Sequence, residues 1–146
     1  LTPAARRQRI ERFYEPFRAA LAATVQDRLA AGARPALVTV HSFTPVYRGQ
    51  RRELDLGILH DTDARLADEL LARIPTGGGL RVARNAPYGP RDGVTHTLRL
   101  HALPHGLLNA MLEIRNDLIA DPAAQATLAA RLAGHLVAAR AALSGD

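Results

Sequence analysis

The stretch ALVTVHSFTP, residues 36–45, decides the fold, because it is an apolar run that ends at His41 and is closed by a proline. Such a run is typical of a strand that is buried on both faces of a parallel sheet. A second run of this kind, LLNAMLEIRND at residues 107–117, contains Glu113 near its end. In open α/β sheets, ligands bind beyond the carboxyl ends of the strands. His41 and Glu113 are therefore predicted at a ligand-binding cleft.

Helix and strand signals alternate along the rest of the chain. An amphipathic helix is predicted from Thr2 to Gly32, and Pro16 should kink or interrupt it, since proline removes a backbone donor and crowds the preceding turn. The remaining signals predict, in order, a polar turn at 49–52, a half-exposed strand at 54–58, a helix from Asp61 to Pro75, a glycine loop at 77–79, a strand at 80–83, an irregular loop at 85–93, a strand at 107–114, and a helix from Asp121 to Gly145. This order predicts a single α/β domain over residues 1–146, with a mostly parallel or mixed sheet flanked by helices.

Composition narrows the classes of function. The chain has 146 residues, 47% of them hydrophobic, and no cysteine, which together favour a soluble, cytoplasmic protein without disulfides or thiolate metal sites. No apolar stretch approaches the roughly 20 residues of a membrane span. The net charge of +5 comes from 19 basic residues, all of them arginine and spread along the chain. Nucleic-acid binders more often show a focused basic stripe, so no nucleic-acid partner is expected.

The residue pattern leaves two alternatives open for each candidate residue. His41 can bind a metal, or it can hydrogen-bond to neighbouring backbone at the end of its strand. The carboxylate of Glu113 interrupts an apolar run, so it would be buried at a sizeable desolvation cost or face a cleft. It could also form a salt bridge with Arg115, its neighbour on the same face of the strand.

Four motifs together resemble the zinc carboxypeptidases and, more closely, the N-formylglutamate amidohydrolase family. They are HSFTP at 41–45, NAPY at 85–88, TLRLH at 97–101 and LEIRNDLI at 112–119, and the resemblance extends over nearly the whole chain. It implies a zinc-carboxypeptidase-like fold and hydrolysis of the amide bond of an N-formyl or N-acyl amino acid. By the resemblance, His41 is a zinc ligand and Glu113 activates the zinc-bound water.

This chemistry explains the residue types, because zinc lowers the pKa of its water to about 7 and a nearby carboxylate can accept the proton. Members of the family carry their other zinc ligands, a histidine and a carboxylate, in a segment that would precede Leu1. The resemblance therefore implies that the chain is the C-terminal part of the domain. Zinc would need ligands from outside this chain, and we expect the isolated chain to bind the metal weakly and to be inactive.

The resemblance also implies a substrate-binding group. An amide at Asn85 and a phenol at Tyr88 can bind a substrate carboxylate or a developing oxyanion. The alternatives are a turn stabilised by the asparagine and a packed tyrosine ring. Arg115 can bind an acidic substrate through two hydrogen bonds, or it can pair with Asp117 or Glu113. His101 follows a stretch that alternates like a strand and would face the cleft.

A second class of function stays open beside the hydrolase. In it, the chain is a metal-free binding or interaction domain that keeps the fold without a complete metal site. The expected partner of the enzyme is a small N-acyl amino acid, with no membrane involved. An exposed sheet edge would favour association into a homo-oligomer, and the sequence leaves the oligomeric state open.

Overall fold

The computed structural model of the protein describes residues 1–75 and 79–144. The chain forms two compact units, Leu1–Pro35 and Ala36–Asp146, and each is described by itself. That they make up one domain stays a prediction. The first two glycines of the predicted loop at 77–79 and the predicted helix end at Gly145 lie outside the described residues. Among the described residues, no helix combines the length and apolar character needed to cross a membrane.

The first unit is helical, and its path is interrupted at the predicted place. Helix α1 (Pro3–Arg9) begins with Thr2, whose hydroxyl accepts a hydrogen bond from the Ala5 N–H at 3.2 Å. A π-helical turn at Ile10–Tyr14 separates α1 from α2 (Glu15–Ala30), so that Pro16 lies in the first turn of α2. Proline is tolerated there because the N–H that it lacks would have no partner within the helix.

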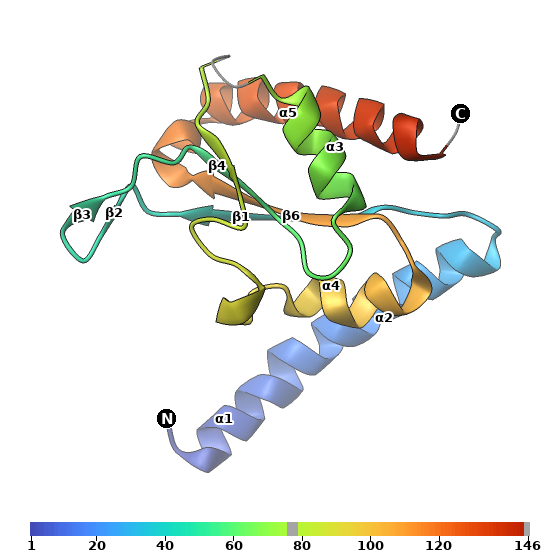
Figure 1. Ribbon diagram of the computed structural model, residues 1–146. Helices are drawn as coiled ribbons and strands as arrows, with labels where there is room; N and C mark the ends of the chain where they lie inside the picture. The colour runs from blue at the N-terminus through green and yellow to red at the C-terminus, as the bar shows by residue number, and fades with distance from the viewer. Residues whose placement is uncertain (76–78, 145–146) are drawn as a thin grey trace. The chain divides into compact units, whose positions relative to one another are not determined.

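A mixed four-stranded sheet forms the centre of the second unit (Figure 1). Its spatial order is β1-β6-β4-β5, with β1 parallel to β6, β5 parallel to β4, and β4 antiparallel to β6. The strands are β1 (Leu37–Phe43), β4 (Leu56–Leu59), β5 (Val82–Arg84) and β6 (Asn109–Arg115). The predicted fold class, an α/β arrangement with a mixed sheet flanked by helices, is therefore confirmed.

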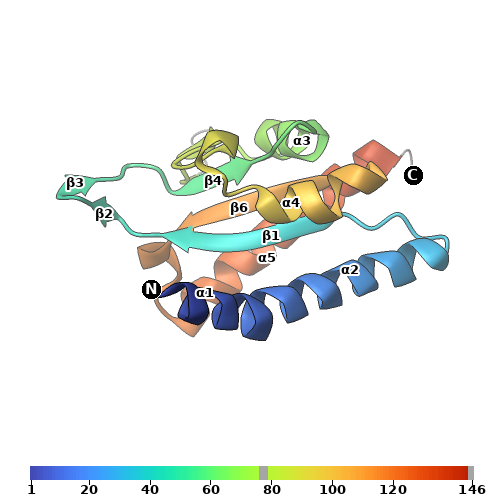
Figure 2. The same cartoon turned by 90° about the horizontal axis from the view of Figure 1, so that it is seen from below.

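Helices cover both faces of the sheet. Helices α3 (Arg65–Arg73) and α5 (Pro122–Ser144) lie on one face, and α4 (His96–His101) lies on the other, in front of the sheet in Figure 2. The larger core cluster joins the first pair of helices to alternate residues of β4 and β6, among them Leu56, Ile58, Leu112 and Ile114. The smaller cluster of Leu59, Leu98 and Met111 lies under α4. Residues of β6 thus alternate between two covered faces.

Four local predictions were wrong. Strand β1 was expected to be buried on both faces, but it lies at the edge of the sheet, and most of its residues are partly or fully exposed, with Val40 64% exposed. Strand β4 was expected to be half exposed, but all its residues are buried, because α3 and α5 cover one of its faces and the backbone of Ala86 covers Gly57 on the other. Residues 97–101 were expected to be strand-like, but they belong to α4, since Thr95, Leu98 and Ala102 are all buried at helical spacing. The polar turn at 49–52 is part of a hairpin, β2 (Val46–Tyr47) with β3 (Gln50–Arg51).

Candidate active site

His41 and Glu113 are neighbours in the structure. The two residues pair across the parallel strands β1 and β6, each near the carboxyl end of its strand. In a parallel pair, residues at the same level direct their side chains to the same face of the sheet. On this face Phe43 and Arg115 form the next pair along the strands. The structure therefore brings together the two residues on which the sequence analysis depended.

Glu113 is buried without a hydrogen-bond partner for one of its oxygens. The residue is 5% exposed, and its Oε2 atom has no hydrogen-bond partner among the residues that the structure describes. Among the described residues, no ion pair joins Glu113 to Arg115, which pairs with Asp55 and Asp117 instead. Burial raises the pKa of the Glu113 carboxyl above its usual range, while the nearby charges of His41 and Arg52 act in the opposite direction. A buried carboxylate of raised pKa is suited to accept and return a proton.

The loop at 85–88 lies directly against this face because Gly57 leaves room for it. Gly57 of β4 pairs with Glu113. A Cβ atom on Gly57 would lie 1.8 Å from the Ala86 carbonyl oxygen, so only glycine allows the loop to approach this closely. The absence of a side chain on β4 therefore places Ala86 and its neighbours next to the carboxylate.

Tyr88 joins this loop to Arg52. The tyrosine packs against the cluster of Leu59, Leu98 and Met111, on the same face as Glu113. Its hydroxyl oxygen accepts a hydrogen bond from Nη1 of Arg52 at 3.1 Å. The hydroxyl proton of Tyr88 can still be donated to a substrate oxygen. Its predicted role in substrate binding stays a prediction.

Arg52 is a candidate residue that the sequence analysis missed. It follows the hairpin, in the stretch that was interpreted as a polar turn. Its guanidinium carbon lies 5.6, 4.5 and 5.3 Å from the ring centres of Phe43, Tyr47 and Tyr88. The sequence offered one signal: these three are the only aromatic residues after position 35. Phe43 and Tyr47 lie close to Arg52 in the chain, but the contact with Tyr88 joins segments that are far apart.

Arg115 holds the neighbouring backbone in place. It is buried, and its guanidinium forms ion pairs with Asp55 and Asp117, each at 2.7 Å. Nη1 also lies 3.4 Å from the carbonyl oxygen of Arg52. The pairing with Asp117 is one of the alternatives left open by the sequence. Binding of substrate by Arg115 stays a prediction, and the contacts give this residue a structural role as well.

Asn85 and His101 take part in local structure. Asn85 Oδ1 accepts a hydrogen bond from the His60 N–H at 2.9 Å, which ties the loop to the end of β4. Asn85 has a φ of 47°, a left-handed conformation that asparagine tolerates better than most residues. His101 is buried at the end of α4. The substrate-binding roles of these two residues stay predictions.

The donor chemistry fits one part of a zinc site. An imidazole at a strand end beside a buried carboxylate with an unpartnered oxygen is the combination that a hydrolytic zinc enzyme uses. Over residues 1–75 and 79–144, no group of three or more His, Cys, Asp or Glu side chains is placed to hold a metal ion. His41 can therefore supply one ligand of the roughly three that such a site takes from the protein.

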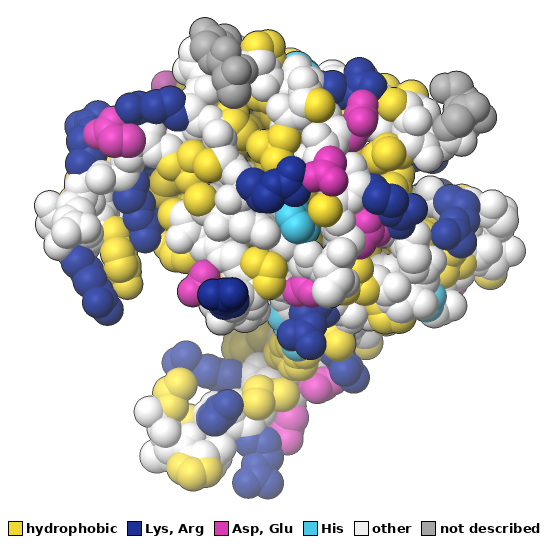
Figure 3. Space-filling view, in the orientation of Figure 1, with side chains coloured by type: hydrophobic (Ala, Val, Ile, Leu, Met, Phe, Trp, Pro, Cys, Tyr) yellow, Lys and Arg dark blue, Asp and Glu magenta, His cyan; other side chains and the backbone are white. Residues whose placement is uncertain are grey.

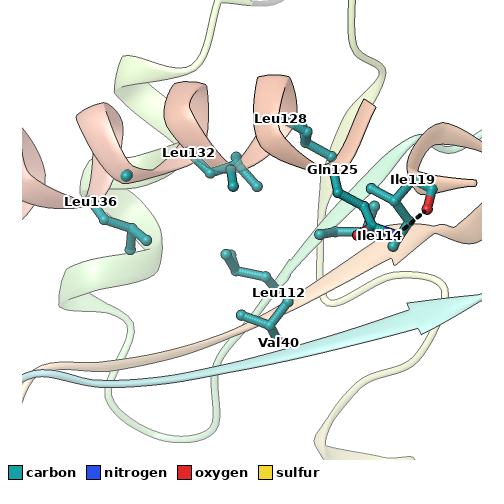
Figure 4. Close-up of a pocket in the computed structure, with 10 residues that line it drawn as sticks. Val40, Leu112, Ile114, Ile119, Gln125, Leu128, Leu132 and Leu136 are labelled. Carbon is teal, nitrogen blue, oxygen red and sulfur yellow. Dashed lines mark hydrogen bonds between the residues drawn. The ribbon is translucent and has the colours of Figure 1, made fainter. Parts of the chain in front are cut away.

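An apolar groove lies on the opposite face of the sheet. Its volume is about 300 Å³, and it lies between α5 and the strands β1 and β6. Figure 4 shows Val40 and Leu112 directed toward Leu132 and Leu136 of the helix. Gln125, which donates to the Ile119 carbonyl oxygen at 3.0 Å, is the polar residue among those that line it. The groove has no titratable lining residue, and Glu113 faces away from it.

A mixed α/β sheet thus places a buried carboxylate and an imidazole side by side near the ends of two parallel strands. The family model for N-formylglutamate amidohydrolase matches residues 1–120. The chain belongs to the N-formylglutamate amidohydrolase family. This result confirms the resemblance inferred from the four motifs.

A solved structure supports the fold. The crystal structure of gene product Atu2144 from Agrobacterium tumefaciens is 52% identical in sequence, with a TM-score of 0.94. The match covers 99% of this chain and 57% of that chain, so this chain spans little more than half the length of its relative. No curated protein matches the chain.

Proposed function

We propose that the protein hydrolyses the amide bond of an N-formyl or N-acyl amino acid, with Glu113 as the general base and His41 as a ligand of a zinc ion. The observation that carries the proposal is the buried Oε2 atom of Glu113, which has no partner and lies beside His41. Burying a carboxylate in this way costs free energy, and such costs are concentrated at functional sites. The family membership supports the amide substrate.

Each residue has a defined part in this proposal. A zinc ion held through His41 and through ligands from outside this chain would supply a water of lowered pKa and polarise the amide carbonyl. Glu113 takes a proton from the attacking water as the oxygen bonds to the acyl carbon. It then delivers the proton to the leaving nitrogen as the C–N bond breaks. The Tyr88 hydroxyl can donate to the oxygen on which negative charge develops.

The test is hydrolysis of N-formylglutamate by the complete gene product, followed by release of formate. Glu113→Gln keeps the size of the side chain but cannot accept the proton, and we expect it to reduce kcat by about 10² to 10⁴ while zinc content is unchanged. Glu69→Gln is the matched control, because Glu69 lies on α3 and pairs with Arg73 there. Near-normal activity of Glu113→Gln would refute the assignment of the base.

Zinc titration of residues 1–146 provides a second measurement. A single imidazole does not supply the usual coordination, so we expect weak binding that His41→Ala abolishes. Tight one-to-one binding would contradict the proposal that the other ligands lie outside the chain. A complete protein that binds N-formylglutamate but does not hydrolyse it would support the alternative, a binding domain without catalysis.

A further inference from the structure

We propose that Arg52 binds a carboxylate of the N-formyl amino acid substrate. This inference rests on the proposed function, because it concerns the substrate of the same site. It extends that function by naming a binding residue and the chemical group that it binds.

The first argument is the uncompensated charge of Arg52. Its neighbours in the second unit have acidic partners: Arg51 pairs with Glu53, Arg81 with Glu53 and Asp55, and Arg115 with Asp55 and Asp117. Within the described part of the chain, Arg52 forms no ion pair, although its side chain is partly buried. Among those residues, the guanidinium of Arg52 donates a side-chain hydrogen bond to the uncharged hydroxyl oxygen of Tyr88. A guanidinium has five N–H donors, so this one retains donors for an anionic group.

The second argument is the aromatic environment that fixes the guanidinium. Phe43 and Tyr47 lie in the stretch that leads to Arg52, Tyr88 comes from the distant loop at 85–88, and the three are the only aromatic residues in the second unit. All three rings lie within 5.6 Å of the guanidinium carbon. Contacts with ring faces stabilise the cation without satisfying its N–H donors. The rings therefore orient the group while leaving its edge able to bind a carboxylate through two hydrogen bonds.

The third argument is the position of Arg52 relative to the base. The guanidinium carbon of Arg52 lies 5.6 Å from the ring centre of Phe43, and Phe43 is two residues beyond His41, the partner of Glu113, on the same face of the sheet. Nη1 of Arg115 lies 3.4, 3.5 and 3.3 Å from the carbonyl oxygens of Arg52, Glu53 and Leu54. These contacts hold the segment that carries Arg52. Arg115 is in this respect a positioning residue.

The chemistry of the substrate class matches this arrangement. Every N-formyl amino acid has an α-carboxylate, which is attached to the same Cα atom as the nitrogen of the scissile bond. N-formylglutamate has a second carboxylate on its side chain. A guanidinium recognises either group with the same geometry. Arginine side chains also gather around the hairpin that leads to Arg52, at the left edge of Figure 3, where they favour approach of an anion.

The experiment uses the complete gene product and two measurements. The first is binding of glutarate, a dicarboxylate without a scissile bond, measured by calorimetry on the zinc-free protein. We expect Arg52→Gln to weaken this binding by about 10- to 100-fold, as for loss of a hydrogen bond to a charged group. Arg52→Lys should retain part of the affinity for glutarate, since lysine keeps the positive charge but cannot form the bidentate pair of hydrogen bonds.

Arg48→Gln is the matched control. Arg48 belongs to the same hairpin and contacts the Tyr47 ring at 5.3 Å, so its loss removes an equal charge nearby. We expect it to change glutarate affinity by less than about twofold, because exposed charges interact weakly. Thermal unfolding of each variant verifies that the protein remains folded. Equal affinities of wild type and Arg52→Gln, or no binding of glutarate by the wild type, would overturn the inference.

The second measurement distinguishes the two carboxylates. It compares kcat/KM for N-formylglutamate with that for N-formylglutamine, which lacks the side-chain carboxylate, and N-formylisoglutamine, which lacks the α-carboxylate. Arg52→Gln should abolish the preference for whichever carboxylate Arg52 binds and retain the other preference. Unchanged discrimination for both would refute the role of Arg52. Glutarate binding needs no turnover, so failure of the proposed hydrolysis would still leave the role of Arg52 tested.

Discussion

Replacing Gly57 by alanine tests the close approach between β4 and the loop at 85–88. The added Cβ would lie 1.8 Å from the Ala86 carbonyl oxygen and 3.1 Å from Cδ1 of Leu59. Real Cβ contacts essentially never fall below 3.0 Å, so the carbonyl would have to move away by 1.2 Å, the difference between 3.0 and 1.8 Å. The obstacle is backbone, which cannot rotate aside as a flexible side chain can.

Two effects follow from this displacement. Overpacking of a filled interior costs about 1 to 3 kcal/mol of the free energy of unfolding. For a domain of this size, that loss lowers the Tm by about 3 to 12 °C. The loop also carries Tyr88, which contacts Arg52, so the proposed substrate-binding face moves with it. A displacement of about 1 Å near reacting groups can reduce activity by about 10²-fold.

Thermal unfolding and kcat/KM for N-formylglutamate measure the two effects. Gly134→Ala is the control, because Gly134 lies in α5 and a Cβ added there would have nothing within 4 Å. Alanine in place of glycine in a helix should raise stability by about 0.5 to 1 kcal/mol and leave activity unchanged. If Gly57→Ala retained both the Tm and the activity of the wild type, the proposed packing of the loop on β4 would be wrong.

Three further results are expected. Burial raises the pKa of the Glu113 carboxyl above its ordinary 4.5, so the folded state holds this proton more tightly than the unfolded state does. Between these two pKa values the unfolded state loses its proton first, so the free energy of unfolding falls as the pH rises. Glu113→Gln should therefore raise the Tm more at about pH 8 than at about pH 4, and equal gains would contradict this. In urea denaturation, Asp55→Asn should cost about 3 kcal/mol or more, since it leaves Arg115 buried beside a neutral group. Asp117→Asn should cost less than about 1 kcal/mol, because that carboxylate is 45% exposed. Arg52→Gln should shift the acidic limb of the pH profile of kcat/KM to higher pH, since it removes a charge that lowers the pKa of Glu113.

The sequence predicted the strands that carry the site because their apolar runs are local. Strands β1 and β6 are continuous in sequence, and their parallel pairing places His41 opposite Glu113. Strand β4 was harder, since Asp55 and Gly57 suggested a face open to solvent. In the structure, Asp55 is buried against Arg115 and Gly57 is covered by the backbone of Ala86. Alternation in a sequence identifies two faces, but it does not reveal what covers them.

Arg52 shows why part of the site could not be predicted. Two of its partners, Phe43 and Tyr47, are near it in the chain, but only the folded chain adds the ring of Tyr88 and places all three around one guanidinium. The surrounding sequence has the polar character of an ordinary turn. His101 shows a second cause of error. The alternating pattern before it predicted a strand, although the buried residues Leu98 and Ala102 have helical spacing.

Glu113 and Arg52 are the two charges on this face that folding alone does not explain. A carboxylate with an unpartnered oxygen and a guanidinium without an acidic partner among the described residues both reduce stability relative to apolar or paired groups. On the same face, the buried residues Asp55 and Arg115 form an ion pair. The fold can therefore pair buried charges that have a structural role. Glu113 and Arg52 interact electrostatically, yet the other groups around them leave each with unused hydrogen-bonding capacity. A substrate carboxylate would satisfy Arg52, and the attacking water would supply the proton that Glu113 accepts, so the proposed reaction uses both groups together.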